Sequence, residues 1–254
     1  MDKTSGTVGA QSLRRSLGLL RMLAEHHEHG ITLTEVMAAS GLERSTAHRL
    51  LSCLAEEQFA ERDPETKAYR LGIDAMQLGF ASMRRVPLVD SCRPLMQKLA
   101  RMSGDTVFLV IRQGDYCLCL HREEGHFPVK VFTTDVGGRR LLGLGAGGLA
   151  LMAQLGDVEV ERIFDRHTEE FAQANFTRER LIQAVKRTRS MGYADITDTL
   201  TVGVSGVGCT FTASASTQAA ISFGAIAPRL PPERKKEMAQ LLKEQLAIAM
   251  QASA

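Results

Sequence analysis

Residues 32–54 read TLTEVMAASGLERSTAHRLLSCL, and this stretch decides the fold of the N-terminal part of the chain. It begins with Thr32-Leu33-Thr34-Glu35, a capping-box pattern in which the Thr hydroxyl and the Glu carboxylate each accept a hydrogen bond from a backbone amide at a helix start. Gly41 follows, and glycine permits the positive φ angle that a turn between helices commonly needs. The pattern predicts a helix over residues 33–39 and a tight turn at 40–42.

A second helix is predicted over residues 43–57, and its two faces differ in chemistry. Apolar side chains at helical spacing form one face: Ala47, Leu50, Leu51 and Leu54. Polar side chains with the same spacing form the other: Ser45, His48, Arg49 and Ser52. A polar face of this kind can dock in a DNA major groove, where Arg reads guanine and hydroxyls hold phosphates. The alternative is an ordinary solvated helix face, and this helix alone does not decide between the two.

The flanking segments favour DNA binding. Upstream, residues 12–24 place apolar side chains at helical spacing: Leu13, Leu17, Leu20 and Leu23, with Leu19 and Met22 broadening the stripe. Downstream, residues 59–71 predict a β-hairpin with a Pro-containing turn. Three helices followed by a hairpin form a winged helix-turn-helix, in which Arg62, Lys67 and Arg70 would lie near the DNA backbone. The sequence therefore predicts binding to double-stranded DNA.

Residues 41–51 (GLERSTAHRLL) and 69–72 (YRLG) resemble the IclR (isocitrate-lyase-regulator) family of bacterial transcription factors, and the resemblance covers nearly the whole chain. It implies DNA contacts from one helix, assisted by the wing around Lys67. The implied contact residues are Arg44, Ser45, Thr46, His48 and Arg49. It also implies a homodimer and a dimer of dimers on the DNA operator. Glu43 departs from the uncharged residue of many members, so it would face away from phosphate or tune operator choice.

The expected fold class is α+β, with a DNA-binding domain at 1–72, a linker helix at 73–86 and an effector-binding domain at 87–254. Pro87 marks the second boundary. A helix is expected over 88–102, followed by strands at 107–111, 116–120 and 129–132 in an antiparallel meander. The resemblance implies that this α/β domain is GAF-like or profilin-like and binds a small-molecule effector.

The tract Gly143-Leu144-Gly145-Ala146-Gly147-Gly148 has the GxGxxG spacing of dinucleotide-binding sites. This spacing makes an oxidoreductase an alternative, but the tract follows predicted antiparallel strands and not the first strand of a βαβ unit. Two interpretations stay open: backbone amides that hold an anion, or glycines needed only for packing. The resemblance implies an effector pocket at Gly145, Ala146 and Gly147. Many members have His where this chain has Gly143, Ser or Thr where it has Gly145, and Lys where it has Leu149.

The resemblance also places the loop and strand after Gly192 at the pocket, so Thr197, Asp198 and Cys209 are the side-chain candidates for effector binding. An Asp in such a turn is more often a loop former than a ligand. A last buried strand is expected over 219–226, and Pro232 opens the final helix.

Composition excludes several other classes. Five scattered cysteines argue against a disulfide framework and favour buried thiols. A redox sensor that uses Cys117, Cys119 or Cys209 is the alternative. The net charge of +2 is too small to indicate nucleic-acid binding by itself. With no apolar leader and no apolar run long enough for a membrane helix, a cytoplasmic protein is expected.

The sequence contains no motif for catalysis, metal or cofactor. The predicted function is transcription regulation, as repressor or activator, in which an effector shifts a two-state equilibrium of operator binding. Small organic acids and aromatic breakdown products are the effector classes that the resemblance implies.

Overall fold

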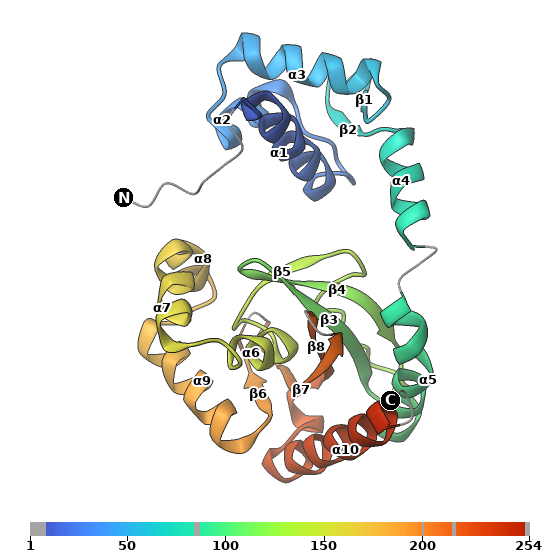
Figure 1. Ribbon diagram of the computed structural model, residues 1–254, viewed down its shortest axis with the longest axis vertical. Coiled ribbons are helices and arrows are strands. Elements are labelled where there is room, and N and C mark those ends of the chain that lie inside the picture. The colour runs from blue at the N-terminus through green and yellow to red at the C-terminus, as the bar shows by residue number, and fades with distance from the viewer. Residues whose placement is uncertain (1–8, 84–86, 200, 215–216, 252–254) are drawn as a thin grey trace. The chain divides into compact units, whose positions relative to one another are not determined.

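A computed structural model describes residues 9–83, 87–199, 201–214 and 217–251 of the 254-residue chain (Figure 1). These residues form two compact units, one within Met1–Val86 and one within Pro87–Ala254. Each unit has its own buried apolar core, so each is described by itself.

The N-terminal unit consists of helices followed by a hairpin and a further helix. Its elements are α1 (Gln11–Glu25), α2 (Leu33–Ser40), α3 (Arg44–Glu56), β1 (Ala60–Arg62), β2 (Tyr69–Leu71) and α4 (Ile73–Met83). Strands β1 and β2 are antiparallel, and Ile31 forms an isolated bridge to Tyr69 that ties the hairpin to the segment before α2. This is a winged helix-turn-helix, as predicted.

The buried face of α1 differs from the predicted one. Leu19 and Leu23 are 1% and 0% exposed, whereas Leu13 and Leu17 are 60% and 41% exposed. Of the predicted stripe, Leu23 is buried and Leu20 packs against the core, whereas Leu13 and Leu17 were wrong, because the core contacts the helix mainly at the i, i+4 pair 19 and 23. An exposed apolar strip is left along the first half of α1.

The turn between α2 and α3 forms as the sequence predicts. The Thr32 hydroxyl accepts a hydrogen bond from the Glu35 amide, and the Glu35 carboxylate accepts one from the Thr32 amide at 2.7 Å. Gly41 caps α2 in the left-handed region, at φ 66°. These contacts fix where α3 begins and which of its faces meets the core.

The C-terminal unit is built on one antiparallel sheet with strand order β5-β4-β3-β8-β7-β6. Its strands are β3 (Thr106–Gln113), β4 (Tyr116–Glu123), β5 (Arg139–Leu141), β6 (Ala194–Thr197), β7 (Val204–Ser214) and β8 (Thr217–Ile226). Its helical segments are α5 (Pro87–Ser103), α6 (Ala146–Met152), α7 (Asp157–Arg166), α8 (Thr168–Gln173), α9 (Arg178–Met191), η1 (Ala227–Arg229) and α10 (Pro232–Gln251).

The strand predicted at 129–132 was wrong. That segment is irregular. The strand that pairs with β4 on the side away from β3 is β5, with Leu141 opposite Tyr116. Val129 and Phe132 are each about half exposed, whereas Val131 is buried. The Arg122 guanidinium lies 4.0 Å from the Phe132 ring centre, so local side-chain packing takes the place of backbone pairing in this segment.

Helix α6 lies very close to the sheet because glycines face it. A Cβ atom on Gly208 would lie 2.8 Å from the Ala146 carbonyl oxygen, and one on Gly147 would lie 2.8 Å from the Val110 side chain. Helices α5 and α10 pack against β3 and β7. Glycine packing therefore explains part of the tract at 143–148, and every strand pairing among the described residues is antiparallel, unlike the parallel βαβ unit of a dinucleotide site.

Candidate functional site

The polar face of α3 is presented to solvent. Ala47, Leu50, Leu51 and Leu54 are buried in the core of the unit. Arg44, Ser45, His48 and Arg49 are exposed, and Thr46 is partly buried. Within the described part of the chain, the Arg44, His48 and Arg49 side chains take part in no hydrogen bond or ion pair, so the helix offers donors that the fold itself does not use. Glu43 is the N-cap residue, is exposed, and makes no capping hydrogen bond with its side chain.

The three predicted basic residues of the hairpin have different surroundings. Arg62 is exposed, and its guanidinium lies 5.5 Å from the Tyr69 ring centre. Lys67 is exposed at the turn, with φ 60°, and its ammonium group donates to the Pro64 carbonyl. The turn is shaped by Asp63, whose carboxylate accepts hydrogen bonds from the Glu65 and Thr66 amides, each at 2.8 Å; these bonds, the Thr66 one first, lower the pKa of Asp63.

Arg70 is partly buried and is engaged inside the N-terminal unit. It forms an ion pair with Asp63 at 3.8 Å and donates to the His29 carbonyl at 3.3 Å. Its Nε atom is buried without a hydrogen-bond partner. We therefore assign Arg70 to bracing the hairpin, which leaves Arg62 and Lys67 as the wing residues available to DNA.

The C-terminal unit contains a cavity beside the glycine tract. Gly145, Ala146 and Gly147 line it, together with side chains from β3, β4, β7 and β8 and with Thr133, Thr134, Thr199 and Thr201. The β4 contribution is Cys117 and Cys119, both buried. Burial raises the pKa of each of these thiols to about 11, so both are uncharged near neutral pH. Such thiols are poor nucleophiles, which weakens the redox-sensor alternative.

Arg140 is a candidate site residue that the sequence did not predict. Among the described residues that line the cavity, it is the one charged side chain. It lies on β5, is partly buried, and a Cβ atom on Gly145 would be 3.4 Å from its Nη1 atom. Burial lowers the pKa of its guanidinium, although Arg stays protonated under all ordinary conditions. The available signal was the Arg139-Arg140 pair directly before the glycine tract, since alternate residues of a strand point to opposite faces.

The predicted side-chain ligands do not line this cavity. Asp198 is exposed, has φ 53°, and accepts a hydrogen bond from the Gly203 amide at 2.6 Å, so it shapes its loop. The Thr197 hydroxyl accepts from the Lys235 ammonium group at 2.6 Å and lies 2.9 Å from the Ser205 hydroxyl; Thr197 faces a neighbouring surface cleft. Cys209 is buried, and it follows Gly208, which faces α6, so it points to the other side of β7. The hydroxyls at the cavity belong instead to Thr133, Thr134, Thr199, Thr201, Ser205 and Ser222.

Other kinds of site have no support among the residues that the structure describes. No cluster of three or more His, Cys, Asp or Glu side chains there could hold a metal ion. A search of the described helices found none long and apolar enough to cross a membrane.

Comparison with known proteins identifies the same two regions. The family model described as the IclR helix-turn-helix domain matches residues 12–64, and the model described as the bacterial transcriptional regulator IclR C-terminal domain matches residues 80–252. The glycine tract and Arg140 fall within the second match, and α3 falls within the first.

Curated relatives are transcription regulators and not enzymes. The HTH-type transcriptional regulator BhcR of Paracoccus denitrificans is 34% identical over 188 residues, which is 73% of this chain and just under two thirds, 66%, of that relative. The transcriptional repressor IclR of Escherichia coli is 25% identical over 91% of this chain and 86% of its own length.

Solved structures share the fold. An IclR family transcriptional regulator from Brucella abortus superposes with a TM-score of 0.82 at 22% identity, covering 95% of this chain and 92% of the other. A second regulator, from Alicyclobacillus acidocaldarius, gives a TM-score of 0.75 at 22% identity over 96% and 98% of the two chains. With both family models matched in chain order, and the C-terminal one covering more than half of the sequence, this chain belongs to the IclR family of bacterial transcriptional regulators.

Proposed function

We propose that α3 enters the major groove of a double-stranded operator and that the wing contacts the adjacent phosphate backbone. The observation that carries this proposal is the solvent-facing set Arg44, Ser45, His48 and Arg49, on a helix whose reverse face is locked into the core. A recognition helix needs this combination, because free donors read DNA only when the helix beneath them is fixed. Arg62 and Lys67 supply charge for phosphate contacts.

The cavity at Gly145, Ala146 and Gly147 is the proposed effector site. It lies within the domain that in this family binds the effector, and it is lined by one cation, several hydroxyls and an apolar wall, which is typical of small-molecule pockets. Effector binding then shifts a two-state equilibrium that changes operator affinity. Organic acids and aromatic breakdown products are both candidate effectors at this level of the argument.

Exposed apolar side chains support assembly into a homodimer. Helix α4 has none of its described side chains buried, and its apolar residues Ile73, Met76, Leu78 and Phe80 are 45% to 60% exposed. Contiguous exposed apolar surface of this kind commonly marks an interface. A dimer would present two copies of α3 to two operator half-sites, and two dimers would occupy an extended operator.

The test is binding of the purified protein to its own upstream intergenic DNA, compared with a scrambled duplex of equal length over a range of salt concentrations. The proposal predicts strong preference for the native segment and an affinity that falls steeply as salt rises, because each phosphate contact releases counterions. Equal affinity for both duplexes at every salt concentration, with and without candidate effectors, would contradict it. Sedimentation of the complex on the same DNA gives the number of bound protomers.

A further inference from the structure

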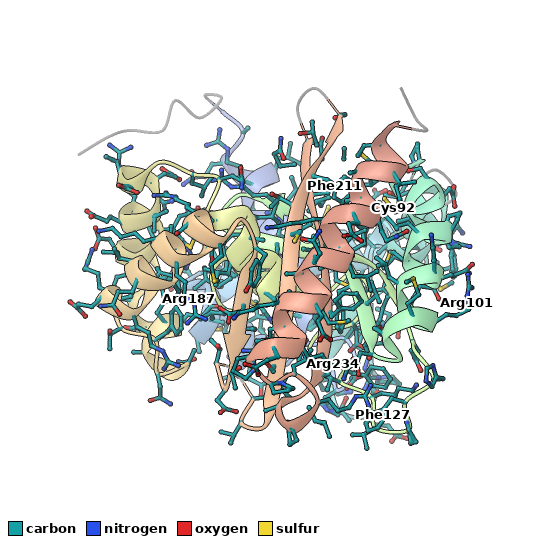
Figure 2. All side chains as sticks on the ribbon, turned by 90° about the horizontal axis from the view of Figure 1, so that it is seen from below. Cys92, Arg101, Phe127, Arg187, Phe211 and Arg234 are labelled. Atoms are coloured by element: carbon teal, nitrogen blue, oxygen red, sulfur yellow. The ribbon has the colours of Figure 1, made fainter. Side chains whose placement is uncertain are left out.

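Arg140 differs from the other partly buried charges of the C-terminal unit, because those charges have partners. The Asp105 carboxylate is 1% exposed and accepts hydrogen bonds from Arg229 at 2.7 Å and from Arg234 at 2.8 Å. Arg234, labelled in Figure 2, comes from the first turn of α10. Charges taken out of water are thus neutralised inside this unit where the fold permits it.

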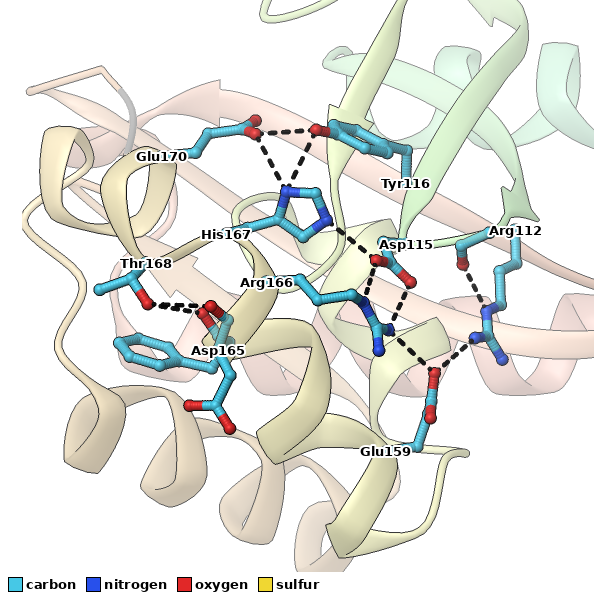
Figure 3. A network of polar contacts seen from close by, with 11 residues as sticks. Arg112, Asp115, Tyr116, Glu159, Asp165, Arg166, His167, Thr168 and Glu170 are labelled. Carbon is cyan, nitrogen blue, oxygen red and sulfur yellow. Dashed lines mark hydrogen bonds and ion pairs between the residues drawn. The ribbon is translucent and has the colours of Figure 1, made fainter. Parts of the chain in front are cut away.

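A second paired cluster is drawn in Figure 3. The Asp115 carboxylate accepts two hydrogen bonds from the Arg166 guanidinium, each at 2.8 Å, and lies 2.9 Å from Nε2 of His167. These hydrogen bonds, with the Arg166 bonds first, lower the pKa of Asp115. Glu170 and Glu159 extend the cluster through Tyr116 and Arg166. A carboxylate therefore lies within reach of each cation here.

Arg140 has no such partner among the described residues. The described residues that line its cavity include no carboxylate, and the two thiols that interact electrostatically with Arg140, Cys117 and Cys119, are uncharged. A partly buried guanidinium without a counter-charge destabilises the fold, since its lost hydration is not replaced. The feature makes physical sense when a bound ligand supplies the missing negative charge.

The free space in the cavity also favours a small ligand over an aromatic ring. It leaves about 60 Å3 for the centres of water-sized molecules, whereas a protein cavity that holds benzene measures roughly 150 Å3. At roughly 10–15 Å3 per water-sized group, this space takes about four to six such groups. A carboxylate with about one to three further heavy atoms fills it.

We propose that Arg140 is the specificity-determining residue of the effector cavity and that the effector is a compact aliphatic carboxylate bound through this guanidinium. This inference rests on the cavity being the effector site and decides between the two effector classes left open above. One guanidinium matches the single charge and planar, two-oxygen geometry of a carboxylate. Phosphate, with a charge near −1.5 to −2, would remain incompletely neutralised. The apolar wall of Phe108, Val110 and Leu144 accommodates the short alkyl part.

The experiment uses the full chain, two variants and six small-molecule probes of stated chemistry. Sodium acetate, propionate and butyrate are titrated at constant ionic strength balanced with chloride, with binding followed by calorimetry and by the melting temperature Tm. Acetamide, benzoate and phosphate are the comparison ligands. Acetamide lacks the negative charge, benzoate replaces the short alkyl chain by an aromatic ring, and phosphate is an anion of different charge and geometry. Arg140→Gln is compared with Arg139→Gln, an exposed Arg on the same strand whose guanidinium lies over the Tyr116 ring.

The expected result is that at least one of the short carboxylates raises Tm of the wild-type protein and of Arg139→Gln, whereas acetamide, benzoate and phosphate have smaller effects. Arg140→Gln should bind the same carboxylate roughly tenfold more weakly or worse, as loss of a charge-assisted hydrogen bond predicts. Equal binding by Arg140→Gln, no stabilisation by any short carboxylate, or tighter binding of benzoate, phosphate or acetamide would overturn the proposal.

The melting temperature of Arg140→Gln without ligand shows whether the substitution itself disturbs the fold. Because Arg140 is unpaired, Arg140→Gln should melt at or above the wild-type Tm in chloride alone; a clear fall in Tm would show that Arg140 is a structural residue and would overturn the proposal. Operator binding without carboxylate should be unchanged in the control variant Arg139→Gln. If wild-type protein showed no operator preference while the carboxylate results held, the proposed function would fail and the ligand assignment would stand.

Discussion

Both units of the chain carry arginines without internal partners, but the two cases differ in how strongly they indicate a ligand. Arg44 and Arg49 on α3 are exposed, so water solvates them and their unpaired state costs little. Arg140 is partly buried in a cavity where the residues that the structure describes offer no carboxylate. Exposure leaves a solvated surface as an adequate explanation for α3, whereas burial demands a compensating group at Arg140. The assignment of α3 to DNA therefore combines its free donors on a fixed helix with the family match, whereas the argument for Arg140 rests on its burial.

The largest expected effect comes from breaking the buried ion pairs of Asp105, because Arg140 has no contact of this kind. Asp105→Asn leaves Arg229 and Arg234 without their carboxylate, so the free energy of unfolding should fall by about 3–5 kcal/mol. Urea denaturation of Asp105→Asn and Arg140→Gln, side by side in chloride, measures the contrast. If the two variants lost similar stability, the distinction between paired and unpaired buried charge would be lost.

A smaller effect is expected at the exposed arginines of α3. Arg49→Ala should weaken operator binding by about 1–3 kcal/mol through loss of base or phosphate contacts, and it should change the free energy of unfolding by less than about 0.5 kcal/mol. Arg21→Ala, at an exposed position of α1 outside the predicted DNA contacts, is the matched control.

Quantitative binding to the native duplex, with denaturation curves for both proteins, checks this prediction. Equal affinity of the Arg49 and Arg21 variants would indicate that the polar face of α3 is only a solvated surface. Unfolding of Arg49→Ala would show that the face is assigned wrongly.

Two variants in the glycine tract distinguish a glycine needed for packing from a glycine at the proposed binding site. Gly147→Ala places a methyl group 2.8 Å from the Val110 side chain, so about 1–3 kcal/mol of unfolding free energy should be lost through overpacking. Gly145→Ala meets nothing nearer than the flexible Arg140 side chain at 3.4 Å and has an extended backbone, so stability should change by less than about 0.5 kcal/mol. The Gly145 variant should instead weaken carboxylate binding by crowding the guanidinium. The reverse order of stability losses would remove Gly145 from the site.

These contrasts also show what could be predicted from the sequence. The capping box at Thr32, the turn at Gly41 and the two faces of α3 depend on neighbours within a few residues, so a local pattern contains them. The prediction for α1 was wrong at Leu13 and Leu17, because the buried face depends on where α3 lies and several helical stripes were compatible with the leucines of α1.

The cavity was harder to predict because its members meet through strand pairing. Arg140 reaches the cavity because β5 pairs with β4, whereas the sequence favoured a strand at 129–132 in that place. Cys209 was recoverable: Gly206 and Gly208 share a face that contacts Ala146, and the residue after Gly208 must point away. Thr197 and Asp198 were predicted from the family resemblance of their loop, whereas their hydrogen bonds with Lys235 and Gly203 form only in the folded unit.

The smallest expected effect concerns the wing, where charge position matters more than any one contact. Lys67→Gln should weaken operator binding by less than about 1 kcal/mol near physiological salt and reduce the slope of log K against log salt by about 1, because one phosphate contact is lost for every sequence alike. Lys98→Gln, exposed on α5 of the other unit, is the control. Arg70→Gln should act differently, since Arg70 already pairs with Asp63 and the His29 carbonyl: stability should fall while the salt slope of the remaining folded protein stays the same. A reduced slope for Arg70→Gln and an unchanged slope for Lys67→Gln would exchange the roles assigned to these two residues.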